Sequence, residues 1–270
     1  MALGSPARAA TPAPGDLLRL AAEAARAASD MLLAGLRTAR TSVLTKSTVT
    51  DMVTEMDHAS EALVREHLLG ARPDDGFLGE ETGLTVGSSG IRWVVDPLDG
   101  TTNYLYGFAG WNVSIAAEDD DGAVVGVVLD PFLDETFTAT RGGGAHRDHA
   151  PIRCSDKSEL ATSLCATGFA YDPRRRAAQA AVLSRVIDQI RDIRRGGAAA
   201  VDLCSVACGR VDAYWERGLG PWDLAAGSLI AREAGATVAG DAELGFTLAA
   251  PPALFGVLRD LLAQAGAAEA

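Results

Sequence analysis

Acidic side chains follow apolar segments at two places along this chain and open a predicted helix at a third. Asp96 and Asp99 come directly after the apolar run 92–95. Glu80 follows a second short apolar segment, and Asp223 opens a segment with helical spacing. A carboxylate at the end of a buried strand is unfavourable unless a cation neutralises it. Because these ligands are hard oxygens with no histidine or cysteine among them, the pattern favours a magnesium site.

The turn that follows Asp96 has the composition of an anion-binding segment. Pro97 stiffens the turn and Gly100 permits a close approach of the backbone. Residues 101–103 then begin a helical turn whose free N–H groups would face an anion. An Asp-Gly pair alone is also typical of an ordinary surface turn, so Asp99 by itself would not establish a site. Beside the other carboxylates, the turn indicates a phosphate site in which metal ions supply the positive charge.

The net charge of −12 in a chain of 270 residues limits the choice of partner. A strongly acidic surface repels nucleic-acid backbones and anionic membranes, so we expect neither as a partner. The sequence contains no run of about 18 apolar residues, the length that predicts a membrane span. The four cysteines include no Cys-x-x-Cys pair, and we interpret them as buried free thiols of a cytoplasmic protein.

The spacing of apolar residues predicts a layered α/β fold. Helical spacing predicts helices over 16–40, 56–69, 174–190, 198–208, 222–234 and 251–264. Continuous or alternating apolar runs predict strands over 77–81, 92–95, 113–117, 123–129, 135–139, 163–167, 212–216 and 246–249, with a hairpin turn at 121–122. Residues 82–90, which are rich in glycine and serine, are interpreted as a loop.

A change in this pattern near residue 150 predicts a division of the chain into parts. Residues 1–15 are rich in alanine and proline without a continuous apolar core, so we expect a disordered tail there. Residues 16–150 are expected to form an α+β subdomain that carries most of the metal ligands. Residues 151–270 are expected to form an α/β subdomain that supplies Asp223 and the pocket for the substrate alcohol.

Four segments together resemble the inositol monophosphatase family. They are GEE at 79–81, WVVDPLDGTTN at 93–103, PWDLAAG at 221–227, and the segment 46–57, which is similar to the mobile N-terminal segment of the family. The likeness runs from about residue 16 to residue 238 and extends to bacterial inositol-1-monophosphatases. It implies alternating α-β-α-β-α layers, as in the fold that the family shares with fructose-1,6-bisphosphatase, and a homodimer.

The resemblance also implies a cofactor of two or three magnesium ions. Glu80, Asp96 and the carbonyl oxygen of Leu98 correspond to ligands of a first ion. Asp96, Asp99 and Asp223 correspond to ligands of a second ion, and Glu80 helps to hold a third through water.

For catalysis and substrate binding, the resemblance implies roles for further residues. Thr101, its hydrogen-bond partner Asp57, and Glu80 correspond to the groups that orient the attacking water. The implied substrate contacts are Leu98, Asp99, Gly100, Thr101, Gly197, Ala198, Ala199, Glu216 and Asp223. Among them, Glu216 corresponds to the acceptor of a hydrogen bond from a substrate hydroxyl. The family often has a hydroxyl side chain at the position of Ala198, and its absence here bears on which alcohol the pocket accepts.

These residues predict hydrolysis of myo-inositol monophosphate by a water that magnesium activates, with the lithium sensitivity that the resemblance implies. Histidinol phosphate, fructose 1,6-bisphosphate and 3′-phosphoadenosine 5′-phosphate are alternative substrates within the same superfamily. The acidic Glu216 favours a neutral polyol, and we interpret the arginine clusters 174–176 and 191–195 as surface charge. A non-catalytic regulatory binding protein, for example in a transcription complex, is the alternative of a different class. The complete set of acids argues against it.

Overall fold

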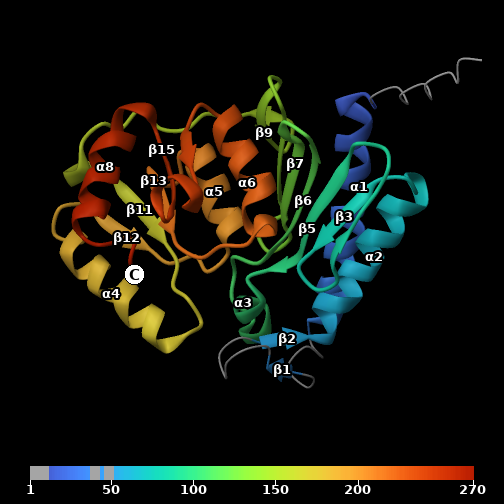
Figure 1. Ribbon diagram of the computed structural model, residues 1–270, viewed down its shortest axis with the longest axis horizontal. Helices are drawn as coiled ribbons and strands as arrows, with labels where there is room; N and C mark the ends of the chain where they lie inside the picture. Colours follow the sequence, from blue (N-terminus) through green and yellow to red (C-terminus); the bar gives the residue numbers. More distant parts are fainter. Residues whose placement is uncertain (1–11, 37–42, 46–51) are drawn as a thin grey trace, which may run out of the picture.

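The structure is a computed structural model that describes residues 12–36, 43–45 and 52–270. Its helices and sheets alternate in five layers, which Figure 1 shows from one outer helical layer at the right to the other at the left. Buried apolar side chains form one cluster against each outer helical layer and one around the central helices. This order confirms the α-β-α-β-α fold expected from the sequence.

The first sheet has eight strands. They are β3 (Gly76–Gly79), β4 (Gly83–Thr85), β5 (Arg92–Asp99), β6 (Asn112–Asp119), β7 (Gly122–Asp130), β8 (Glu135–Thr140), β9 (Gly144–Arg147) and β10 (Ala150–Pro151). Their order in space is β10-β9-β8-β7-β6-β5-β3-β4, and only β3 and β5 are parallel neighbours. The outer face of this sheet is covered by α1 (Pro14–Gly35) and α2 (Glu55–Ala71).

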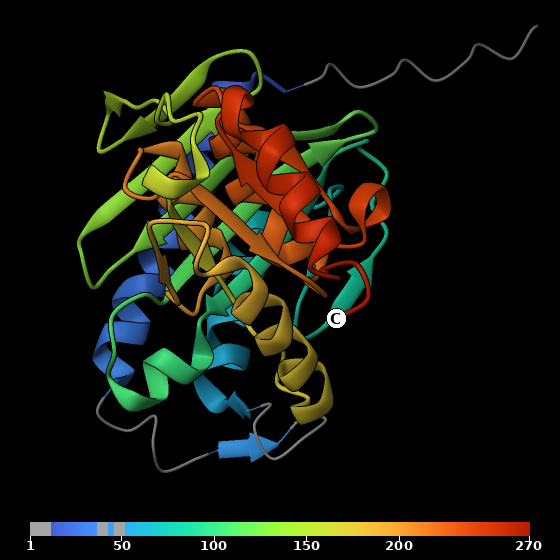
Figure 2. The same cartoon turned by 90° about the vertical axis from the view of Figure 1, so that its left-hand side faces the viewer.

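Two central helices, α5 (Ala199–Ala207) and α6 (Pro221–Glu233), separate the first sheet from a second one. The strands of the second sheet are β11 (Leu164–Thr167), β12 (Asp192–Arg194), β13 (Ala213–Glu216), β14 (Thr237–Ala239) and β15 (Thr247–Ala250), in the order β12-β11-β13-β15-β14. Its outer face is covered by α4 (Pro173–Val186) and α8 (Pro252–Gln264), which lie in front in Figure 2. Shorter elements are β1 (Val43–Thr45), paired with β2 (Met52–Thr54), α3 (Thr101–Tyr106), η2 (Leu160–Thr162) and α7 (Asp241–Leu244).

Strand β5 is buried on both faces, as its continuous apolar run predicts. Trp93 and Val95 pack into the cluster beneath α1 and α2, whereas Val94 packs into the cluster around α5 and α6. The strand that ends in Asp96 and Asp99 is therefore held from both sides. No helix in the described ranges is long and apolar enough to cross a membrane.

Several short elements differ from the sequence-based expectation. The loop expected over 82–90 contains β4, and the strands β12 and β14 were not expected; each of the three has three residues and lies at a sheet edge. Such short strands carry too little periodicity to be recognised. The helix expected over 16–40 ends at Gly35, and the one expected over 174–190 ends at Val186.

The hairpin turn expected at 121–122 lies one residue earlier. Strands β6 and β7 pair Asp119 with Gly122, which leaves Asp120 and Asp121 in the turn. Residues 1–11 of the expected tail and the segment 46–51 lie outside the described residues. The last two residues of the expected tail, Pro14 and Gly15, instead begin α1.

Candidate active site

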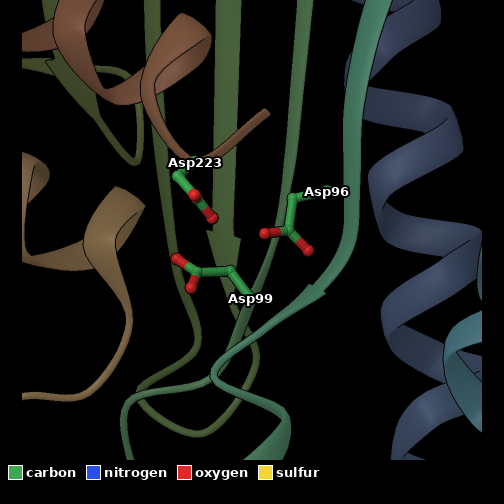
Figure 3. A group of neighbouring side chains, drawn as sticks. All are labelled: Asp96, Asp99 and Asp223. Carbon is green, nitrogen blue, oxygen red and sulfur yellow. The ribbon is translucent and has the colours of Figure 1, made fainter. Parts of the chain in front are cut away.

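A bulge in β5 brings Asp96 and Asp99 to the same side of the first sheet. Side chains three residues apart in a regular strand point to opposite faces. The register between β5 and β6 pairs Asp96 with Ser114 and then Asp99 with Asn112, so that three steps along β5 match two along β6. The extra residue on β5 shifts the alternation of its side chains between the two faces of the sheet by one position. Both carboxylates therefore face the same space beyond the end of the strand (Figure 3).

Asp223 completes the cluster from the first turn of α6 (Figure 3). One carboxylate oxygen from each of Asp96, Asp99 and Asp223 lies within 4.8 Å of the others. The backbone N–H of Gly220 donates a hydrogen bond of 2.6 Å to Asp223 Oδ2 and fixes that side chain. A carboxylate in the first turn of a helix also interacts favourably with the helix dipole.

Burial and mutual repulsion disfavour the charged forms of these three acids. Burial raises the pKa of Asp96 well above its ordinary value, and the negative charges of Glu80, Asp99 and Asp223 raise it further. The pKa of Asp223 is likewise well raised, first by burial and then by Asp99. Burial raises the pKa of Asp99, although hydrogen bonds from Asn112 and Ala200 oppose the rise. A divalent cation would remove this repulsion, so the all-oxygen donor set fits magnesium.

Glu80 lies in the turn after β3 and lines the same cleft. Its backbone N–H donates to the carbonyl oxygen of Val95 at 3.2 Å, which sets it beside the end of β5. Its charge acts on the pKa of both Asp96 and Asp223. The structure thus brings the fourth predicted metal-binding side chain to the three aspartates.

The Thr101 hydroxyl lies against Asp57, as the sequence predicted. Thr101 Oγ1 is 3.0 Å from Asp57 Oδ1 and 3.1 Å from the carbonyl oxygen of Leu98. Asp57 is fully buried in the first turn of α2. With its proton directed to one of these oxygens, the hydroxyl keeps lone pairs that can accept a hydrogen bond from water.

Gly100 is required by the turn between β5 and α3. Its φ of 87° is left-handed, and a methyl group there would lie 2.8 Å from the carbonyl oxygen of Gly110. The Asn103 side-chain amide donates to the carbonyl oxygens of Gly110 and Gly196, at 2.9 and 2.8 Å. This amide ties the turn after β5 to the loop that contains Gly197.

The predicted site residues surround a cleft of about 370 Å³. Those that line it are Glu80, Asp96, Leu98, Asp99, Gly100, Thr101, Gly197, Ala199, Glu216 and Asp223. Asp57 and Ala198 are buried behind this lining. Ala198 packs near Gly100, since a methyl group on Gly100 would lie 3.2 Å from the Ala198 Cβ.

Glu216 lies at the end of β13 and lines the same cleft as the acidic cluster. The Tyr214 hydroxyl donates a hydrogen bond of 2.7 Å to Glu216 Oε2. Burial raises the pKa of Glu216 to about 7, and Tyr214 and Arg195 oppose the rise. Its charge therefore changes near neutral pH.

Two arginines that the sequence analysis interpreted as surface charge line the cleft. Arg175 of α4 and Arg195 of the loop before α5 are both cleft residues, together with Arg217. Arg195 favours the charged forms of Asp99 and Glu216, so it acts on both halves of the cleft. Both side chains are exposed, as the surface-charge interpretation expects, but they lie beside the cleft rather than on a remote part of the surface. The spacing of a basic run along the sequence does not tell which part of the surface it occupies.

The Inositol monophosphatase family model matches residues 15–265. The inositol-1-monophosphatase SuhB of Mycobacterium tuberculosis is 44% identical over 236 residues, which cover 82% of this chain and 80% of the relative. The Nus factor SuhB of Haemophilus influenzae is 42% identical over 224 residues, which cover 82% and 84%. The crystal structure of extragenic suppressor protein suhB from Bartonella henselae matches with a TM-score of 0.85 and 35% identity, over 92% of this chain and 98% of that one.

Proposed function

This chain belongs to the inositol monophosphatase family, and from that premise we propose that it is a magnesium-dependent phosphomonoesterase that hydrolyses myo-inositol monophosphate to inositol and phosphate. The observation that carries the proposal is the convergence of Asp96, Asp99 and Asp223 within one cleft. The metal dependence of the family agrees with this donor set. The inositol substrate is supported by the names of relatives.

In this proposal Glu80, Asp96 and the Leu98 carbonyl would hold one ion, and Asp96, Asp99 and Asp223 a second. Bound magnesium supplies positive charge for the phosphate and lowers the pKa of water. The Thr101 hydroxyl, directed by Asp57, accepts a hydrogen bond from the attacking water.

Other groups of the chain hold the attacking water and the phosphate. Glu80 accepts a second hydrogen bond from the water, and the two hydrogen bonds together orient the water towards phosphorus. Backbone N–H groups of Gly100 and Thr101 bind phosphate oxygens. Among the described residues that line the cleft there is no serine, cysteine or histidine. That composition supports direct attack by water rather than a covalent phosphoenzyme.

Arg175 and Arg195 favour a second group of substrates. Two cleft arginines would bind an additional anionic group on the alcohol. Fructose 1,6-bisphosphate and 3′-phosphoadenosine 5′-phosphate carry such a group, whereas histidinol phosphate does not. The arginines therefore weaken the preference for a neutral polyol that Glu216 suggested.

Magnesium-dependent phosphate release across a panel of these phosphate esters tests the proposal. We expect turnover with magnesium and none after chelation, with myo-inositol monophosphate the best substrate. Absence of turnover on every member would contradict the enzymatic proposal. The preferred ester then assigns the alcohol.

A regulatory role is the second candidate, because several relatives are named Nus factor SuhB. Such a role would survive Asp99→Asn, whereas hydrolysis would not. Complementation of a strain that lacks the protein with this variant separates the two roles. We further propose a cytoplasmic homodimer that lithium inhibits, which light scattering and a lithium titration of the activity would test.

A further inference from the structure

Helix α2 contacts both of the segments that carry the proposed metal-binding acids, namely the end of β5 and the turn after β3. Asp57 Oδ1 lies 3.0 Å from the Thr101 hydroxyl oxygen. The Ser60 hydroxyl donates a hydrogen bond of 2.8 Å to the carbonyl oxygen of Pro97. Both contacts reach the turn at the end of β5. The next residue of the helix, Glu61, reaches the other loop.

Glu61 holds the turn after β3 by both oxygens of its carboxylate. Oε2 accepts a hydrogen bond of 2.8 Å from the backbone N–H of Glu81, and Oε1 accepts one of 2.8 Å from the N–H of Thr82. Glu61 is fully buried, so both bonds are shielded from water. We infer that Glu61 is a positioning residue that holds Glu80 in the metal site.

The residue before Glu80 is held against the same carboxylate. A methyl group on Gly79 would overlap the Glu61 side chain, so this position needs glycine as long as Glu61 keeps its place. The N–H of Glu80 itself donates to the carbonyl oxygen of Val95. Three consecutive N–H groups from residue 80 to residue 82 therefore have fixed acceptors. The turn can present Glu80 to Asp96 in only a narrow range of positions.

A carboxylate suits this role better than a neutral amide. Within the described residues, Glu61 forms no ion pair, so its burial is offset by charge-assisted hydrogen bonds from the backbone. Glutamine has one accepting oxygen, and its amide group would face the second N–H without an acceptor. Glu61→Gln should therefore displace the turn while leaving the helix almost unchanged in shape. Groups that hold a metal ligand without touching the metal themselves typically contribute about 10–100-fold to metal affinity or activity.

This inference rests on the proposed metal-dependent function, and it is tested by binding of magnesium alone. Isothermal titration calorimetry without substrate should show a dissociation constant for magnesium about 10-fold higher in Glu61→Gln. Amide hydrogen exchange should become faster at Glu81 and Thr82. The catalytic constant at saturating magnesium should approach that of the unmodified protein, a separation that a general loss of structure would not give.

Glu66→Gln is the matched control. Glu66 is exposed on the same helix, so the substitution removes the same charge without touching the turn. Magnesium affinity and exchange should then match those of the unmodified protein.

Gly79→Ala provides a second route in case Glu61→Gln does not fold. It retains Glu61 but displaces its carboxylate, so it should weaken magnesium binding in the same way. Unchanged magnesium affinity in both variants would overturn the inference. So would fast exchange of the Glu81 and Thr82 amides in the unmodified protein. Lack of phosphatase activity would instead count against the proposed function, because magnesium affinity and amide exchange do not depend on turnover.

Discussion

Asn112 donates a hydrogen bond of 2.9 Å from its Nδ2 to Oδ2 of Asp99, across the bulge between β5 and β6. The backbone N–H of Ala200 donates to the same oxygen at 2.8 Å. Two donors from different layers thus hold the Asp99 carboxylate toward Asp96 and Asp223 (Figure 3). The acids of the proposed metal site are therefore oriented by groups that do not themselves line the cleft.

Asn112→Ala should weaken the site without unfolding the protein. The substitution removes one of the two donors to Asp99, and we expect about 10-fold lower magnesium affinity. Asn112 Oδ1 is buried without a hydrogen-bond partner in the described part of the chain. Removing this oxygen, which has no partner, recovers part of the stability that is lost with the hydrogen bond to Asp99. The melting temperature of the metal-free protein should therefore change little. A magnesium titration of phosphatase activity measures the change in affinity, and thermal melts in a chelator measure the change in stability. The same magnesium dependence in the variant and the unmodified protein would show that Asn112 does not orient Asp99.

Asp99→Asn should abolish activity and yet stabilise the metal-free protein. An asparagine keeps one oxygen for the Asn112 and Ala200 donors but removes a charge from the acidic cluster. Activity should fall by more than about 100-fold, the upper effect of groups that only support a metal ligand. Relief of repulsion should raise the metal-free melting temperature by a few degrees, at about 2–4 °C per kcal/mol for a chain of this size.

The pH dependence of that stability has a defined sign. The folded-state pKa of Asp99 is raised by burial, so the metal-free protein loses stability as the pH rises towards and through that pKa. Asp99→Asn should reduce this loss, and magnesium should stabilise the variant less than the unmodified protein. A variant with full activity would show that the metal assignment is wrong.

Arg175→Gln and Arg195→Gln should affect substrates according to their charge. Each removes a guanidinium from the cleft, so kcat/KM for an ester with a second anionic group should fall by about 10-fold, equivalent to about 1.4 kcal/mol. The kcat/KM for myo-inositol monophosphate should fall much less than that for the ester with a second anionic group. Arg174→Gln is the control, because Arg174 precedes Arg175 on α4 and does not line the cleft. Equal effects on both substrates would exclude recognition of a second anion.

The acids of the candidate site could be recognised from the sequence, because three of them follow apolar runs and Asp223 opens a predicted helix. Glu80 and Asp96 are sixteen positions apart in the sequence, yet Glu80 follows β3, Asp96 lies in β5, and these two strands are paired. Their convergence follows from a local pattern that repeats at neighbouring strand ends. Apolar spacing by itself predicted only a layered α/β fold, and β5 and α5 are buried as their apolar runs suggest. The order of the five layers came from the family resemblance.

The groups that hold those acids could not be found in this way. Asn112 reads as the start of an apolar strand, and only the register of β6 against β5 reveals its contact with Asp99. Glu61 looks like one of several acids on an amphipathic helix, although it is buried against the turn after β3. Arg195 belongs to a basic run whose orientation depends on the neighbouring sheet. Such contacts join segments that are distant in the sequence, which local periodicity does not describe.

Glu216 should make substrate binding depend on pH near neutrality. Its pKa is raised to about 7 by burial, so the side chain is a neutral acid below that pH and a carboxylate above it. A carboxylate accepts a hydrogen bond from a substrate hydroxyl more strongly than a neutral acid. The charged and titratable groups that interact with it include Tyr214, Arg195, Asp99, Asp202, Asp223 and Asp241.

KM for myo-inositol monophosphate should therefore fall by about 5-fold as the pH rises through 7, for a difference of about 1 kcal/mol. The phosphate group of the substrate also titrates near pH 6, so the informative comparison is with Glu216→Gln. The glutamine oxygen accepts at every pH, and KM of the variant should keep only the dependence that the substrate contributes. Steady-state kinetics across this range, at saturating magnesium, measure the difference between the two profiles. Identical profiles would show that Glu216 does not contact the alcohol.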